Sequence, residues 1–155
     1  MYKLKLRLKI DADNDNTGEL FGDLEADKFA GQGSAWFELK KLTEQAKRFS
    51  EYPISDEEPP IIEGGYWKKD TSAIEQEHLF ISAYPIGSRG VLGIMIRLSV
   101  PYDNPERIGL KCRTSAEFLV HYEQLGQFSK DIQALAAGTM TEVVIEQYVE
   151  DSLSI

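Results

Sequence analysis

The chain of 155 residues contains one cysteine, Cys112, and only two histidines. A lone cysteine excludes an intramolecular disulfide and a metal site built from cysteines alone, and it fits a reducing compartment. Because Cys112 falls on the apolar face of an alternating segment, we interpret it as a small buried hydrophobic residue. Neither His78 nor His121 has further metal ligands at a regular helical spacing, so we predict no metal and no cofactor.

Long apolar runs are also missing. No run approaches the roughly 18 apolar residues that a membrane-spanning helix needs. The first ten residues are basic, but apolar and charged residues alternate there, and a continuous apolar segment with a cleavage site is lacking. We therefore expect a soluble, cytoplasmic protein that does not bind membranes.

Positive charge is scarce, with 17 Lys and Arg against 26 Asp and Glu and a net charge of -9. Nucleic acid is disfavoured as a partner, since binding to phosphates requires clustered basic side chains. An acidic surface instead favours a basic protein partner.

Catalytic signatures are absent as well. Ser34 and Ser88 are not embedded in the Gly-x-Ser-x-Gly turn of hydrolases, and the segment 31–34 lacks the further residues of a phosphate-binding loop. The segment 11–19 begins like a calcium-binding EF-hand loop, with aspartates at alternate positions. Asn16 stands where that loop needs Gly, and Gly22 where it needs Glu, so a plain turn is favoured over a calcium site. We assign no catalytic residue.

What the sequence does contain is a strong pattern of strands. Apolar residues alternate with Lys3, Lys5, Arg7 and Lys9 at the N-terminus, which predicts a half-buried strand. Acidic residues on the next strand are expected to pair with these charges, and they are Glu19, Asp23, Glu25 and Asp27. The apolar segments 79–84 and 91–100 predict a hairpin at the centre of an antiparallel sheet.

Two segments change to helical spacing, at about 38–51 and 122–137. Residues 29–37 contain two closely spaced glycines, which suggest a bulge or a sharp bend. Residues 68–77 are expected to form a polar connection, 108–120 a long strand and 151–155 a frayed end. Residues 139–149 also suit a helix because of their acidic residues, but their β-branched residues favour a last strand. The predicted fold is therefore a single α+β domain over residues 1–155. It contains one twisted, mostly antiparallel sheet of about six or seven strands, in the order ββαβββαβ, with both helices on one face.

Two loops are candidate binding sites. Residues 50–60 form an acidic, proline-rich loop followed by aromatic residues, a composition common in protein interfaces. The candidate surface comprises Asp56, Glu57, Glu58, Glu63, Tyr66 and Trp67. The aromatic residues, and Trp36 with them, can equally be rim residues of the core. Ser88 and Arg89, in the hairpin loop, are the candidates for anion binding, although such a loop is more often a simple turn.

The chain resembles small bacterial α+β proteins in three segments. They are the glycine-rich segment before Ala35, Trp36 and Phe37, the helix that follows it, and the helix from Tyr122 to Gly138. Some of these bacterial proteins are described as immunity-type proteins of toxin systems. The resemblance implies a binding role without catalysis, in which an acidic protein covers a basic toxin surface.

We therefore predict a non-enzymatic binding protein whose acidic surface recognises a protein partner, as in immunity-type proteins. The alternative is a small-ligand-binding domain or an enzyme with a site near Arg89, Tyr66 and Trp67. Homodimerisation through an edge strand is also compatible with the sequence.

Overall fold

The computed structural model describes residues 3–69, 72–101 and 112–149. It shows an α+β fold with two helices and two antiparallel sheets of four strands each. The elements follow in this order: β1 (Lys5–Ala12), β2 (Thr17–Ala26), β3 (Phe29–Glu38), α1 (Leu39–Lys47), the short 3-10 helix η1 (Arg48–Ser50), β4 (Ile61–Trp67), β5 (Ile74–Ile86), β6 (Val91–Ser99), β7 (Arg113–His121), α2 (Tyr122–Ala137) and β8 (Val143–Glu146).

Sheet A has the strand order β3-β2-β1-β8. The N-terminal alternation is confirmed, because Leu6 and Leu8 are fully buried while Lys5, Arg7 and Lys9, which alternate with them, are partly or fully exposed. Lys5 lies opposite Glu25 and forms an ion pair with it at 3.6 Å. The other predicted pairings are only partly correct. Glu19 lies opposite Asp11, and Asp27 lies in the turn between β2 and β3, where its φ of 58° is left-handed.

Sheet B has the order β4-β5-β6-β7. The predicted central hairpin is confirmed, since β5 and β6 are its two inner strands and Leu79 pairs with Leu98. Apolar residues on the inner face of this hairpin are almost completely buried, which the sequence pattern predicted. They are Leu79, Ile81, Ala83, Leu92, Ile94, Ile96 and Leu98.

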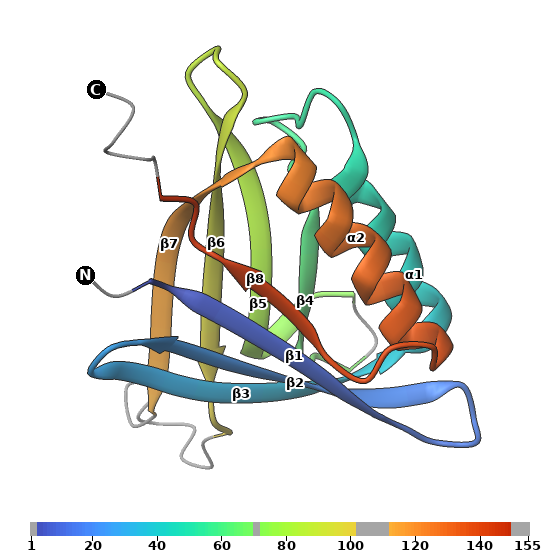
Figure 1. The fold of residues 1–155 in the computed structure, drawn as a ribbon. Coiled ribbons are helices and arrows are strands. Elements are labelled where there is room, and N and C mark those ends of the chain that lie inside the picture. The colour runs from blue at the N-terminus through green and yellow to red at the C-terminus, as the bar shows by residue number, and fades with distance from the viewer. Residues whose placement is uncertain (1–2, 70–71, 102–111, 150–155) are drawn as a thin grey trace.

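The two helices pack against each other and complete the core. Figure 1 shows them side by side in front of sheet B, next to the strands of sheet A. Leu42, Ala46 and Phe49 from the first helical segment join Leu125, Phe128, Ile132 and Leu135 from the second in one cluster with both sheets. The hydroxyl of Ser129, which is fully buried, donates a hydrogen bond of 2.7 Å to the carbonyl of Ala46. Among the described residues, no helix is long and apolar enough to cross a membrane.

The prediction of one sheet with six or seven strands was wrong. Residues 29–38 are a full strand rather than a bend, so three strands precede the first helix and four separate the helices. The predicted polar connection 68–77 is also shorter, because β5 already begins at Ile74. Cys112 is exposed rather than buried. The predicted strand 108–120 is observed from Arg113, and its first residues and the expected frayed end lie outside the described residues.

The second sheet is possible because glycines allow the two sheets to approach closely. Gly22 and Gly33 face each other across the β2–β3 ladder. A Cβ atom on Gly33 would lie 2.5 Å from the carbonyl oxygen of His78, which belongs to β5. A Cβ atom on Gly22 would lie 2.9 Å from a side-chain methyl of Leu98. The closely spaced glycines therefore serve contact between sheets rather than a change of direction within one sheet.

The segment after β8 joins the two sheets along one side. The amide of Gln147 donates to the carbonyl of Leu4 next to sheet A, and the amide of Tyr148 donates to the carbonyl of Leu119 in β7, both at 2.8 Å. The Tyr148 ring also packs edge-on against His121, with 3.9 Å between ring centroids. Part of the β7 edge is thus already occupied within the chain, and homodimerisation through an edge strand stays a prediction.

Three glycine-to-alanine variants test the contact between the sheets. Gly33→Ala should destabilise the fold by about 3 kcal/mol or more, because backbone atoms cannot give way. Gly22→Ala should cost about 1 kcal/mol, because the methyl of Leu98 can move. Gly126→Ala in α2 meets no atom within 4 Å and should stabilise the protein by up to about 1 kcal/mol. Unfolding in denaturant measures all three, and equal losses for Gly22→Ala and Gly33→Ala would contradict the close backbone contact.

Candidate functional site

The acidic loop of residues 51–60 connects η1 to β4 and is anchored to the core at two points. Ile54 is buried, and its amide donates to the hydroxyl oxygen of Tyr122 at 3.1 Å. At the other end, the hydroxyl of Ser82 in β5 donates to the carbonyl of Pro60 at 2.9 Å. The loop therefore has a defined backbone although it contains no regular structure.

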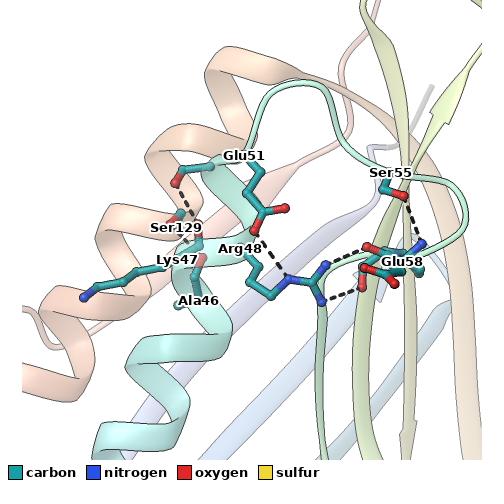
Figure 2. Close-up of polar contacts among 9 residues, drawn as sticks. Ala46, Lys47, Arg48, Glu51, Ser55, Glu58 and Ser129 are labelled. Atoms are coloured by element: carbon teal, nitrogen blue, oxygen red, sulfur yellow. Dashed lines mark hydrogen bonds and ion pairs between the residues drawn. The ribbon is translucent and has the colours of Figure 1, made fainter.

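Arg48 fixes the loop from the inside, as Figure 2 shows. Its guanidinium group donates to the carbonyl oxygens of Glu58 at 2.6 Å and Pro59 at 3.1 Å, and it forms an ion pair with Glu51 at 3.5 Å. The amide of Glu58 also donates to the hydroxyl of Ser55 at 3.0 Å. A planar guanidinium with several donors can satisfy two carbonyls at once, which an ammonium group does less well.

The carboxylates of the loop point to solvent. Asp56, Glu57 and Glu58 are exposed, and within the described residues none of their carboxylates forms an ion pair or a hydrogen bond. The candidate acidic surface is thus held in place through its backbone while its charges remain free to contact a partner.

The hairpin tip lies beside this loop. Tyr52, Pro53 and Ile54 share a shallow hollow of about 260 Å³ with Ser88, Tyr122 and other residues of the tip. The rings of Tyr52 and Tyr122 meet edge-on at 4.9 Å between centroids. Ser88 and Arg89 are exposed in the turn between β5 and β6. The two loops that the sequence identified separately therefore form one end of the molecule.

Tyr66 and Trp67 lie at the other end of sheet B. Trp67 pairs with Ile74, at the start of β5, while Ile86 adjoins the hairpin tip. Twelve steps of about 3.3 Å put roughly 40 Å of strand between these positions. Arg89, Tyr66 and Trp67 therefore do not meet in one site, and Trp67 is also separated from Asp56–Glu58.

Trp67 instead lines the same groove as Trp36, at the seam between the two sheets. Both indoles are about half exposed, at 53% for Trp36 and 44% for Trp67. They line a groove of about 390 Å³ together with residues of β3, α1 and β4, and we call it the tryptophan groove. Its lining comprises Trp36, Phe37, Glu38, Lys41, Gln45, Glu63, Trp67 and Ser72. The close contact of Gly64 with Ala35 and Phe37 brings these strands together.

Glu63 connects this groove to the outer face of sheet B. There Glu77 receives two hydrogen bonds from Arg97, at 2.8 and 2.9 Å, and the guanidinium lies 3.7 Å above the centre of the Phe80 ring. Partial burial and the nearby carboxylate of Glu77 raise the pKa of Glu63, while Arg97 opposes the shift. Among the described residues Glu63 has no ion-pair partner, because Arg97 is engaged by Glu77.

A second polar pair, Tyr84 and Glu117, lies on the same face of sheet B. The hydroxyl of Tyr84 donates to Glu117 at 2.5 Å, and this hydrogen bond raises the pKa of Tyr84 to about 12. A tyrosine held in its protonated form is a poor general base at neutral pH.

The residues considered for catalysis and metal binding are not assembled into such sites. Ser34 donates a hydrogen bond of 2.7 Å to the carboxylate of Glu19. In the loop 11–19, Asp15 accepts hydrogen bonds from the amide and hydroxyl of Thr17, as expected for a turn. The described part of the chain contains no group of three His, Cys, Asp or Glu side chains arranged to hold a metal.

Sequence reasoning missed several residues of these surfaces. Arg48, Lys41 and Gln45 were read only as parts of a helix, and nothing in their spacing indicates what they contact in the fold. Trp36 was left open between core rim and interface. Its position three residues after Gly33 was the available signal, since an odd spacing in a strand places the indole on the face opposite to the glycines.

Comparisons with known proteins identify no relative. No protein-family model matches the chain, and neither a curated protein nor a solved structure matches it significantly.

Replacement of Arg48 tests whether it holds the acidic loop. Arg48→Lys keeps the charge but cannot donate to both carbonyls in the same geometry, so stability should fall by about 1 to 2 kcal/mol. Amide exchange of residues 55–58 should become faster while the sheets stay protected. Lys47→Ala is the control, since it changes the exposed neighbouring residue. Unchanged exchange in Arg48→Lys would show that the loop does not depend on this side chain.

The raised pKa of Glu63 predicts that the ionised carboxylate lowers the stability of the fold in a pH-dependent way. The folded state binds the proton of this carboxyl more tightly than the unfolded state, so ionisation lowers stability as the pH rises above the ordinary value of 4.5. Glu63→Gln should therefore unfold at a higher temperature than the parent protein at pH 7, and this difference should shrink below pH 4.5. Thermal unfolding at both pH values measures it. Glu44→Gln, on the exposed side of α1, provides the comparison.

Proposed function

We propose that this protein is a non-enzymatic binding protein whose acidic loop recognises a basic protein partner. The observation that carries the proposal is the clamp by Arg48, which orders the loop and leaves Asp56, Glu57 and Glu58 exposed. An ordered loop loses less conformational entropy on binding than a mobile one. Carboxylates on such a loop favour a partner with a positive patch and speed up the encounter.

The tip of the central hairpin extends this surface. The hollow between Tyr52 and Ser88 joins the acidic loop to residues with aromatic and small side chains. Tyrosine at the centre of a polar surface is typical of residues that contribute strongly to protein interfaces. The proposed footprint therefore combines charge at its rim with Tyr52, which is 81% exposed, near its middle.

The resemblance to immunity-type proteins suggests the kind of partner. A protein that neutralises a toxin must cover a surface rather than turn over a substrate, and a net charge of -9 suits a basic toxin. We therefore include an immunity-like role in the proposal, with a basic toxin as the partner class.

The alternative of a small-ligand site is supported only as two separate sites, one at each end of sheet B. Arg89 and the tryptophan groove lie at opposite ends of sheet B, so they are not parts of one ligand site. Among the described residues, neither Arg89 nor any other Lys or Arg lines the hollow at the hairpin tip, so the hollow offers no cation to an anionic ligand.

The test is capture of a partner from cells of the source organism with three purified proteins. The first is the parent protein, and the second carries Asp56→Asn, Glu57→Gln and Glu58→Gln. The third is a matched control with Asp13→Asn, Asp27→Asn and Glu44→Gln, which removes three exposed charges elsewhere. We expect the parent protein and the control to retain one basic protein. The loop variant should retain at least about tenfold less of that protein, because several charges that steer the partner are lost.

Two further measurements make the result specific. The affinity of the complex should fall when the salt concentration is raised from about 0.05 to about 0.5 M, because salt screens exposed charges. The captured protein should then be produced alone and tested for toxicity in cells with and without this protein. Equal retention by all three proteins would refute the role of the acidic loop, and a non-toxic partner would refute the immunity-like role.

A further inference from the structure

The tryptophan groove has a composition that the proposed acidic loop does not explain. It lies at the start of α1, between Trp36 on β3 and Trp67 on β4, whereas the acidic loop follows the end of that helical segment. Large aromatic side chains that remain half exposed on a folded domain often mark binding sites. Two of them on opposite strands border this one hollow of about 390 Å³.

The polar atoms of the groove are mainly acceptors. The side-chain oxygen of Gln45 is buried and has no hydrogen-bond partner among the described residues. A buried acceptor without a partner is costly, so a donor arriving from outside would be favoured. The carboxylate of Glu63 is partly buried without an ion pair, and Glu38 adds a second carboxylate. Among the residues that the structure describes, Lys41 is the one basic residue that lines the groove.

Indole faces carry negative potential and attract cations, most strongly when a carboxylate stands nearby and water is partly excluded. Burial and the neighbouring carboxylate of Glu77 raise the pKa of Glu63, and Arg97 only partly opposes this shift, so a further positive charge beside the carboxylate would be favoured. An anionic ligand would meet two carboxylates here. A neutral ligand would leave the charge on Glu63 uncompensated.

We propose that the tryptophan groove binds a cationic side chain, with a guanidinium as the best fit, through the two indoles, Glu63 and the oxygen of Gln45. A guanidinium stacks flat on an aromatic ring and donates in its plane to carboxylate and amide oxygens. The proposal of a cation site depends only on the residues of the tryptophan groove. That the side chain belongs to a basic protein rests on the proposed function.

The position of the groove suits a second anchor for the same partner. Glu38 precedes α1 and Arg48 begins the turn after it, so about ten residues separate the groove from the clamped loop. At about 1.5 Å per residue this is roughly 15 Å. A standard interface covers about 800 Å² on each partner, which is wide enough to include both.

The protein contains only two tryptophans, Trp36 and Trp67, so its indole fluorescence reports on this groove alone. The probe is N-acetylargininamide, and N-acetylcitrullinamide is the matched control because it has nearly the same shape without the charge. Titration of the whole protein with the arginine compound should change the fluorescence in a saturable way. The citrulline compound should bind at least about fivefold more weakly, the ratio expected for a modest cation–π contribution.

Variants assign the contacts. Glu63→Gln should weaken binding of the arginine compound about fivefold, and Lys41→Gln should strengthen it by removing a like charge from the groove. Trp36→Phe and Trp67→Phe should each weaken binding, and the indole that remains should still respond. Circular dichroism checks that each variant is folded.

The outcomes separate this proposal from the proposed function. No response to the arginine compound, or an equal response to both compounds, overturns the cation site. A saturable response to maltose in place of the arginine compound also overturns it, because the groove would then take a carbohydrate. The triple variant of Asp56, Glu57 and Glu58 should bind the arginine compound like the parent protein. Loss of partner capture in that variant therefore tests the acidic loop without affecting the result at the groove.

Discussion

The contact between the two sheets at Gly22 and Gly33 is the constraint on which the rest of the structure depends. These glycines oppose each other in sheet A, and the paired Leu79 and Leu98 of sheet B lie next to them. Without side chains on the glycines, the backbone of β3 can approach that of β5. The inner face of the central hairpin is then covered partly by sheet A, and the helices cover the remainder.

This arrangement also places the surfaces proposed for binding. Since β3 crosses close to β4, Trp36 and Trp67 line the same groove at the seam although 31 positions separate them in the chain. The helix that follows β3 leads from this seam to Arg48, which holds the loop before β4. One short helical segment thus connects the tryptophan groove with the acidic loop, and both are consequences of how the sheets pack.

Local pattern was enough to predict the elements that bury one face. The alternation around Leu6 and Leu8, the central hairpin and the helix ending at Gly138 all follow from the spacing of apolar residues. The second sheet could not be predicted in this way, because a glycine that permits contact with a distant strand looks like a glycine in a bend. The same holds for the candidate sites. The acidic loop is visible in the composition of the sequence, whereas the partners of Arg48 and the groove that the two tryptophans share depend on long-range packing.

The way in which basic side chains are used explains why carboxylates remain available in so acidic a chain. Lys5, Arg7 and Arg97 pair with carboxylates and hold strands together. Arg48 differs, because most of its hydrogen bonds go to main-chain carbonyls, so it orders the loop without neutralising Asp56, Glu57 or Glu58. Glu63 is left without a partner for a related reason, since Glu77 already occupies Arg97. At both ends of α1 the fold therefore fixes the backbone and leaves negative charge unpaired, which is the arrangement that a cationic partner requires.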